Sequence, residues 1–426
     1  MMPVLFFLIL FAMGATLAVH AGEPSWPDAS NPVAGMGICI PFTEAKPGEL
    51  EMLSRAGFHW VRTDFGWEST EKKAGVYDFS AYDRLLNALD KFHLRALLIL
   101  DYGNRLYDGG LSPHTDESRA AFARWAAASA LHFQGRGVVW EIWNEPDGSF
   151  WKPHANAGDY AKLAIAASRA IRAAAPHEMV IGPALCDMEL GFLDPAVSGG
   201  ILNYWTGISI HPYFRFGPES YGAAYAKVRN LIDQRAPPGR KVEVLCGESG
   251  YSSAWWGIDE ALEGKYLARL LLFDVWADVP MTIWYDWRDD GTDPSNDEHH
   301  FGIVRHDYHP GAANAYEPKP AYDAARTYSE QLAGLRFQSR LNLASGEDYV
   351  LRFKGAGAEC FVAWTTAWWA HDATLDLPNG TYVITRYDAK KQTAIEVTNH
   401  TLKLHLDSGP QYIREKGGRD SDGITK

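Results

Sequence analysis

Short apolar runs alternate with amphipathic segments from residue 35 to about residue 334. The apolar runs, short enough for β-strands, are 35–40, 60–64, 95–100, 138–143, 179–182, 207–210, 242–245 and 282–285. The intervening segments place apolar residues at helical spacing over 47–56, 79–92, 120–133, 160–175, 221–232, 262–276 and 320–335, with a weak or irregular fifth helix. Strands that alternate with helices in this way form a parallel sheet. Eight such units predict an α/β fold, a (β/α)8 barrel over residues 22–334.

The pattern changes after about residue 336, where short strands follow one another without helices. Strands are predicted at 349–353, 360–365, 382–385 and 402–406, and Asn379-Gly380 is a strong hairpin turn. We therefore expect a small β-sandwich over 335–415, followed by a polar, disordered tail over 416–426. The sandwich either docks on the barrel or serves as a binding module, whose candidate contacts are Trp364, Trp368 and Trp369.

The N-terminus has the features of a targeting segment. Residues 3–19 are almost entirely apolar, and no charged side chain precedes Glu23. Small residues at Val19 and Ala21 flank a typical signal-peptidase cut, so we predict a signal peptide over 1–21 and an exported protein, periplasmic or secreted. Because no Lys or Arg precedes the apolar run, an uncleaved N-terminal membrane anchor stays the alternative.

Charge and composition narrow the classes of partner. The formal net charge is −13 and no basic run occurs, which excludes nucleic acid as a partner. Aromatic residues make up 13% of the chain, with 16 Trp, and such a surplus supplies flat surfaces for sugars or other ring ligands. The cysteines are far apart and are expected to be buried free thiols rather than a disulfide framework; they are Cys39, Cys186, Cys246 and Cys360.

Two glutamates at strand ends carry the candidate chemistry. Glu145 follows the fourth strand in the sequence Trp-Asn-Glu-Pro, and Glu248 ends the seventh in Cys-Gly-Glu-Ser. A barrel places its active site at the C-terminal ends of its strands, so both carboxyl groups are expected at one rim. Hydrolysis of a glycosidic bond needs such a pair, one to protonate the leaving oxygen and one to attack the anomeric carbon.

These motifs resemble those of the clan A glycoside hydrolases. Residues 140–146 (WEIWNEP) resemble the strand-four acid/base motif, and residues 247–250 (GESG) resemble the strand-seven nucleophile motif. The separation of the glutamates, 248 − 145 = 103, suits three intervening βα units. Within the clan, family 39 is the most similar, because a small β-sandwich follows its barrel, and family 5 is close behind.

The resemblance extends to other rim positions. Arg62 on the second strand resembles the arginine that pairs with the nucleophile. His211 and Tyr213 resemble the strand-six His-x-Tyr pair, and we expect His211 to hydrogen-bond within the site or to substrate. Trp284 resembles the strand-eight aromatic floor of the subsite for the cleaved sugar.

The two glutamates are expected to have different roles. Glu145 is the expected general acid/base, with a pKa raised by partial desolvation and by the nearby carboxylate. Glu248 is the expected nucleophile, held ionised by Arg62 and the Tyr213 hydroxyl. Asn144 is expected to bind the sugar 2-hydroxyl. The two carboxyl groups are predicted to lie ~5–5.5 Å apart, the spacing for direct attack.

Several aromatic side chains are candidate sugar contacts. Trp284 is expected to stack on a sugar, and Trp143 fits either the core or a sugar contact equally well. Trp255 and Trp256 are expected to form a subsite wall. Glu141 points to the same side as Glu145 but lies deeper in the barrel, so we expect a buried ion pair there.

Histidines and aspartates cluster between residues 286 and 309, which raises the question of a metal. Their spacing matches no zinc pattern, and the Gly and Glu positions of a calcium loop are absent. We therefore expect a solvated strand-eight loop and no metal or other cofactor.

Together these features predict an exported, metal-independent retaining β-glycosidase that acts on a β-linked oligo- or polysaccharide as a monomer. The alternative is a catalytically silent carbohydrate-binding protein on the same barrel, which would keep the aromatics and lose a carboxylate. The sugar, its linkage and endo or exo action stay open, because sugars differ by single hydroxyl groups read by the loops.

Overall fold

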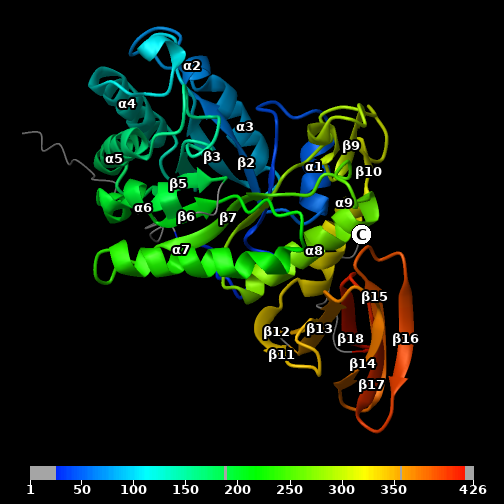
Figure 1. The fold of residues 1–426 in the computed structure, drawn as a ribbon. Coiled ribbons are helices and arrows are strands. Elements are labelled where there is room, and N and C mark those ends of the chain that lie inside the picture. The colour runs from blue at the N-terminus through cyan, green and yellow to red at the C-terminus, as the bar shows by residue number, and fades with distance from the viewer. Residues whose placement is uncertain (1–24, 187–189, 356, 418–426) are drawn as a thin grey trace, which may run out of the picture.

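The computed structural model describes residues 25–186, 190–355 and 357–417. The predicted signal peptide or anchor lies outside the described residues, as do residues 418–426 of the predicted tail. Eight parallel strands close into a barrel surrounded by helices, and antiparallel sheets follow at the C-terminus (Figure 1). The predicted fold class, a (β/α)8 barrel with a small C-terminal β-sandwich, is confirmed.

The barrel strands follow one another in chain order around the barrel. They are β1 (Met36–Cys39), β2 (Trp60–Gly66), β3 (Arg95–Asp101), β4 (Val139–Ile142), β5 (Met179–Leu185), β6 (Gly207–Ile210), β7 (Glu243–Ser249) and β8 (Thr282–Trp284). Gly37 in β1 pairs with Trp60 on one side and with Ile283 on the other, which closes the barrel.

Helices cover the outside of the barrel (Figure 1). They are α1 (Glu49–Arg55), α2 (Trp67–Thr70), α3 (Ser80–Asp90), α4 (Asp116–His132), α5 (Ala157–Ala174), α6 (Leu190–Ser198), α7 (Gly222–Arg235), α8 (Glu260–Trp276) and α9 (Pro320–Leu332). The helix that the sequence signals weakly is α6, which has nine residues and contains Pro195. None of the described helices is long and apolar enough to cross a membrane.

The side chains of the barrel strands point alternately into two apolar layers. Every second side chain points into the barrel, because successive residues of a strand face opposite sides. The buried side chains that fill the interior are Cys39, Trp60, Leu97, Ile99, Val139, Met179, Ile181, Leu245, Met281 and Ile283. The residues between them, such as Val61, Leu98 and Trp140, belong to the larger core between the sheet and the helices. Polar side chains near the strand ends therefore point into the mouth of the barrel.

The C-terminal domain begins three residues after α9. A six-stranded sheet has the order β11 (Arg336–Leu341), β12 (Asp348–Gly355), β13 (Ala358–Thr365), β18 (Gln411–Glu415), β15 (Gly380–Arg386), β16 (Gln392–Val397). Two further strands, β14 (His371–Asp376) and β17 (Thr401–Leu406), pair with each other. The predicted boundary between 334 and 335 falls between α9 and β11.

The six-stranded sheet contributes buried residues to a core on each of its faces. Leu351, Phe353 and Val362 join the core that continues under the barrel helices. Val350, Phe361 and the apolar residues of β14 and β17 form a separate core on the other side. The sandwich therefore packs on the barrel with one face of its larger sheet, beside α8 (Figure 1).

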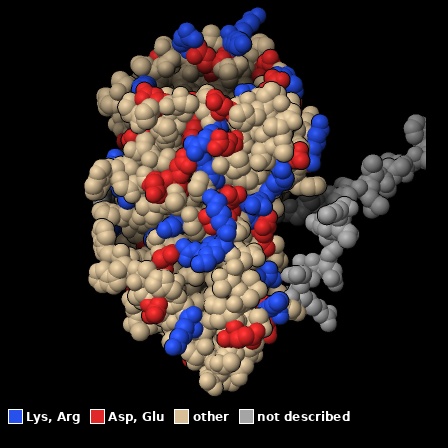
Figure 2. Space-filling model, turned by 90° about the vertical axis from the view of Figure 1, so that its right-hand side faces the viewer, with Lys and Arg blue, Asp and Glu red and all other residues tan. Residues whose placement is uncertain are grey.

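Charged residues of both signs are spread over the surface seen in Figure 2. On the face seen in Figure 2, Lys and Arg are interspersed with Asp and Glu, and no extended basic area forms. The cysteines are free, as predicted, and three of them are buried.

Candidate active site

A pocket of about 740 Å³ opens at the C-terminal ends of the strands. The turn after β4 brings Glu145 to it, and the end of β7 brings Glu248. The predicted site residues that line this pocket are Arg62, Asn144, Glu145, Tyr213, Glu248 and Trp255. The barrel thus gathers side chains from five separate segments of the chain into one site.

The guanidinium of Arg62 is the centre of the site. Its Nε donates to Glu141 at 2.7 Å, its Nη1 to Glu248 at 2.5 Å and its Nη2 to Asn144 at 2.8 Å. Burial opposes the positive charge, but the carboxylates of Glu141 and Glu248 outweigh it and raise the pKa of Arg62 well above its ordinary value. Glu141 is fully buried, so the predicted ion pair in the barrel interior is confirmed.

Two donors face the carboxylate of Glu248. The Tyr213 hydroxyl donates to its Oε1 at 2.8 Å, and Arg62 donates to its Oε2. Charge-assisted hydrogen bonds of this kind stabilise a negative charge. The carboxylate is 12% exposed, so a small opening to the pocket remains. This arrangement suits an ionised nucleophile.

The surroundings of Glu145 favour its neutral, protonated form. Burial raises the pKa of Glu145 to about 7, and the charge of Arg62 only partly offsets this. The expected contribution of a neighbouring carboxylate is not among the causes, so desolvation alone produces the rise. A carboxyl group of this kind can donate a proton near neutral pH and accept it again.

His211 links Arg62 to Glu145. It is fully buried, and burial lowers its pKa to about 4, so the imidazole is neutral near pH 7. Its Nε2 lies 3.4 Å from Nη2 of Arg62, which can only donate, so Nε2 is the acceptor nitrogen. The other nitrogen, Nδ1, therefore carries the hydrogen and donates to Oε1 of Glu145 at 2.9 Å. This leaves Oε2 of Glu145 to carry the transferable proton.

Asn144 is fixed by hydrogen bonds on both ends of its amide. The Oδ1 atom accepts from Arg62, and Nδ2 donates to the Tyr102 hydroxyl at 3.2 Å. The second hydrogen of Nδ2 has no acceptor among the described residues, and Asn144 lines the pocket. The amide is thus oriented toward a bound hydroxyl group.

The two glutamates lie close together. One oxygen of Glu145 and one oxygen of Glu248 are within 4.8 Å of each other. Carboxyl groups about 5–5.5 Å apart suit direct attack, whereas about 6.5–9.5 Å leaves room for a water. His211 contributes a nitrogen to the same cluster, but a metal ion there would compete with Arg62 for Glu248.

Two of the predicted sugar contacts are buried. Trp284 is 1% exposed and packs outside the barrel near Tyr251, with ring centroids 6.1 Å apart. The reason is strand alternation: Ile283 points into the barrel, so Trp284 points out, and Tyr285 is the aromatic residue that lines the pocket. Trp143 is also fully buried, 4.9 Å from the ring of Trp151. Neither tryptophan offers a free ring face to a sugar.

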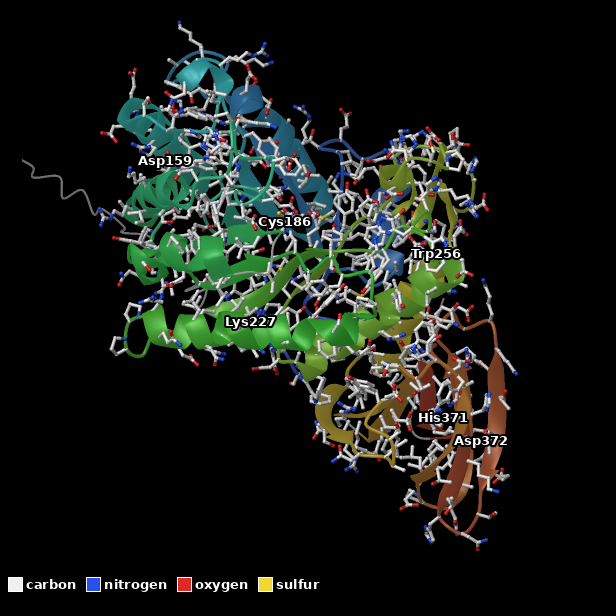
Figure 3. All side chains as sticks on the ribbon, in the orientation of Figure 1. Asp159, Cys186, Lys227, Trp256, His371 and Asp372 are labelled. Atoms are coloured by element: carbon white, nitrogen blue, oxygen red, sulfur yellow. The ribbon has the colours of Figure 1, made fainter. Side chains whose placement is uncertain are left out.

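The adjacent Trp255 and Trp256 differ in position. Trp255 lines the pocket, packs edge-on against Phe301 at 5.2 Å and lies under the Arg215 guanidinium. Trp256 is 94% exposed at the surface and is not among the pocket residues (Figure 3). Only the first of the pair forms a wall of the pocket, so the predicted two-residue wall is half correct.

Carboxyl groups dominate the lining of the pocket. They belong to Asp64, Glu145, Glu248, Asp286, Asp290 and Glu298, whereas Arg62 is the only Lys or Arg among the lining residues. Asp286 is 4% exposed, and burial together with the charge of Asp290 raises its pKa well above the ordinary value. Its Oδ1 has no hydrogen-bond partner among the described residues. The expectation of a solvated loop is therefore wrong for Asp286, which faces the pocket.

Asp64 and Asp101 form a second pair that the sequence prediction missed. Asp64 lines the pocket and Asp101 is fully buried behind it. Burial, reinforced by the charge of Asp64, raises the pKa of Asp101 well above its ordinary value. The sequence could have indicated Asp64. Side chains two residues apart on a strand point to the same side, so Asp64 shares the inward face of β2 with Arg62.

The sequence is similar to those of glycoside hydrolases. The family model for cellulase (glycosyl hydrolase family 5) matches residues 41–317. A β-xylosidase from Geobacillus stearothermophilus is 29% identical over 240 residues, which are 46% of this chain and 45% of that protein. This chain therefore matches less than half of the length of that relative.

Solved structures share the fold over nearly the whole described chain. A family 39 glycoside hydrolase from Bacteroides cellulosilyticus WH2 superimposes with a TM-score of 0.78 at 25% identity, over 92% of this chain and 83% of that one. A monomeric β-xylosidase from Caulobacter crescentus CB15 superimposes with a TM-score of 0.66 at 16% identity, over 92% and 97% of the two chains.

Proposed function

Because the chain belongs to the cellulase (glycosyl hydrolase family 5) family of clan A glycoside hydrolases and folds like members of family 39, we propose that it is a retaining β-glycosidase with Glu145 as acid/base and Glu248 as nucleophile. The main support for this proposal is that two carboxyl groups lie close together in environments that favour opposite charge states. Glu248 has two donors, and Glu145 is desolvated to a pKa of about 7.

In the first step, Glu248 attacks the anomeric carbon while Glu145 protonates the leaving oxygen. The bond from the anomeric carbon to the leaving oxygen breaks as the bond to Glu248 forms. Glu145 is protonated near neutral pH, so it can donate at that moment. The amide of Asn144 lies beside Glu145 and can donate to the 2-hydroxyl, a contact that strengthens in the transition state.

In the second step, Glu145 acts as a base. Having lost its proton, it accepts one from a water that attacks the anomeric carbon and releases Glu248. The hydrogen on Nδ1 of His211 stabilises the carboxylate form of Glu145 during this interval. Two inversions leave the β configuration unchanged.

The charge of the pocket supports a neutral sugar as substrate. The only arginine among the described lining residues already donates to Glu141, Glu248 and Asn144. Among these lining residues, a uronate or sulfate group would thus meet carboxyl groups and no cation that lacks a partner. Carboxyl groups such as Asp64 and Asp286 accept hydrogen bonds from sugar hydroxyls instead. The β-xylosidase relative makes a β-xyloside the first substrate to test.

Export and a monomeric state are part of the proposal. The apolar N-terminus supports export of the protein to the periplasm or medium. The Caulobacter crescentus structure with the same fold is described as monomeric, which supports a monomer here. The substrate is a β-linked oligo- or polysaccharide, and the mechanism proposed above requires neither a metal nor a cofactor.

Azide rescue assigns the two glutamates. In Glu145→Ala, an aryl β-glycoside with a good leaving group should still form the glycosyl-enzyme, while turnover falls about 10²–10⁴-fold because the base is missing. Azide needs no base, so it should restore turnover and give a β-glycosyl azide after two inversions. In Glu248→Ala, azide can occupy the vacated space and give an α-glycosyl azide after one inversion.

Proton NMR of the anomeric centre distinguishes the two products, and the wild type without azide is the control. Exchanged products would reverse the two roles. Failure of azide with both variants, together with an inactive wild type, would favour the silent carbohydrate-binding protein.

Two substrates that differ in charge test whether the pocket prefers a neutral sugar. The 4-nitrophenyl β-glucoside and β-glucuronide differ at C6, where the second carries a carboxylate. Two like charges 4 Å apart repel by about 4 kcal/mol near a protein surface, so kcat/KM for the glucuronide should be at least about 100-fold lower. The methyl ester of the glucuronide is the control, since it restores neutrality and should recover activity. Equal kcat/KM for glucoside and glucuronide would refute a neutral-sugar pocket.

The predicted cleavage site tests export. Expression of the chain from Met1 onward should release a protein that begins at Gly22, because cleavage is expected after Ala21. Mass analysis of the exported protein measures this start directly. An intact N-terminus recovered with membranes would instead support the anchor.

A further inference from the structure

We propose that the β-sandwich positions the active site, because Trp364 of the sandwich holds the loop that carries His211 and Tyr213. This proposal rests on the proposed function above, since it assigns a role to that loop in the same reaction. The loop runs from the end of β6 to α7 and contains the short 3-10 helix η3 (Pro218–Tyr221). Glu219 in η3 is the point where the sandwich contacts it.

Glu219 is the centre of a buried three-residue junction. Its Oε1 accepts from Nε1 of Trp364 at 2.7 Å and from Nε of Arg269 at 2.8 Å, and its Oε2 accepts from Nη2 of Arg269. The side chains of Glu219 and Arg269 are 7% and 5% exposed, and Trp364 is fully buried. Three parts of the chain therefore meet here: the sandwich, the loop and α8.

Trp364 is itself held firmly within the sandwich. Its ring stacks on Tyr349, with centroids 4.9 Å apart and planes 12° apart. The guanidinium of Arg340 lies 3.8 Å from the centre of the Tyr349 ring on β12. A donor on such a rigid support fixes the position of its acceptor, so Trp364 restricts Glu219 and the loop around it.

Hydrogen bonds continue from the loop to the nucleophile strand. The carbonyl of Phe216 accepts from the Tyr251 hydroxyl at 2.8 Å, and that hydroxyl lies 2.7 Å from the hydroxyl of Tyr221. Tyr221 is in turn 3.2 Å from Oγ of Ser249, the residue after Glu248. The loop is thus fastened at one end by the sandwich and along its length to the end of β7.

The position of the loop affects the proposed reaction through Tyr213. This residue follows β6 in the same loop and donates to Glu248. If Glu219 loses the hydrogen bond from Trp364, only Arg269 of this junction still holds the loop, so the Tyr213 hydroxyl moves more freely and its hydrogen bond to Glu248 weakens. A carboxylate with fewer donors is protonated more readily, so activity is lost at a higher pH on the acid side of the pH profile.

Trp364→Phe tests this inference with little change in shape. Phenylalanine can keep the stack on Tyr349 but cannot donate to Glu219, which stays buried with one donor fewer. We expect kcat/KM per active site to fall about 10-fold, the effect of losing one hydrogen bond to a charged group. The acid limb of kcat/KM should move to higher pH, in the same direction as in Tyr213→Phe. In the double variant, Trp364→Phe should add no further shift, because the affected hydrogen bond is already absent.

Tyr387→Phe is the matched control. The Tyr387 hydroxyl also joins the sandwich to α8, donating to the carbonyl of Ala261 at 3.3 Å, and this acceptor lies outside the loop. Removing it should leave the acid limb unchanged. Active-site titration separates a loss of folded enzyme from a change in the folded enzyme, since partial unfolding lowers the active fraction without moving the pH profile.

Hydrogen–deuterium exchange keeps the inference testable even if the proposed activity is absent. Peptides that cover residues 211–221 should exchange faster in Trp364→Phe than in Tyr387→Phe or the wild type. Unchanged exchange in that loop would overturn the proposal whatever the activity. Faster exchange with an unmoved acid limb in an active enzyme would limit Trp364 to a structural role and overturn its link to catalysis.

Discussion

The ion pairs of Arg62 with Glu141 and Glu248 are the interaction on which the rest of the site depends. A guanidinium that is 2% exposed is stable only when its charge is compensated and its donors are used. Glu141 supplies that compensation from inside the barrel, away from the pocket. In the proposed mechanism Glu248 becomes a neutral ester, and Glu141 then still balances Arg62. Removing one partner from a buried pair costs about 3–5 kcal/mol, so the permanent partner preserves the site through the reaction.

The same guanidinium influences both glutamates, which have different roles in the proposed mechanism. It donates directly to Glu248, which favours a negative charge there, and to Asn144, which fixes the amide. Its hydrogen-bond link to Glu145 runs through the neutral ring of His211, and its charge only partly offsets the effect of burial on the pKa of Glu145. Two carboxyl groups within 4.8 Å of each other therefore have different environments, which is what an acid and a nucleophile at one bond require.

Strand periodicity determined how much could be predicted from the sequence. The barrel was predictable because its strands and helices alternate regularly, and residues at strand ends meet at one rim in any such barrel. The gathering of Glu145, Glu248, Arg62 and Tyr213 at one pocket was predictable in this way, helped by their resemblance to clan A motifs. Glu141 was predictable as a buried partner because it shares the inward face of β4.

Two aromatic residues and the loop after β8 show where the sequence was less informative. Trp284 was expected in the pocket, but alternation from Ile283 turns it outward and brings Tyr285 in. Trp143 has a positive φ of 68°, so its side chain leaves the strand pattern and enters the core. Asp286 was missed for a different reason: the chain after β8 folds back over it, and no local pattern of sequence indicates that a loop carboxyl group becomes buried.

Desolvation keeps Glu145 protonated near neutral pH, whereas Glu248 accepts hydrogen bonds from Tyr213 and Arg62. The pH dependence of kcat/KM tests it with two β-glycosides of the same sugar, one whose leaving group needs protonation and one whose leaving group does not. Since the general acid must be protonated, we predict that kcat/KM for the first substrate falls as pH rises through about 7, the pKa of Glu145. This fall should be absent with the second substrate and in Glu145→Gln. A basic limb near 7 that persists in Glu145→Gln, or activity toward the first substrate that stays constant to about pH 9, would contradict the account.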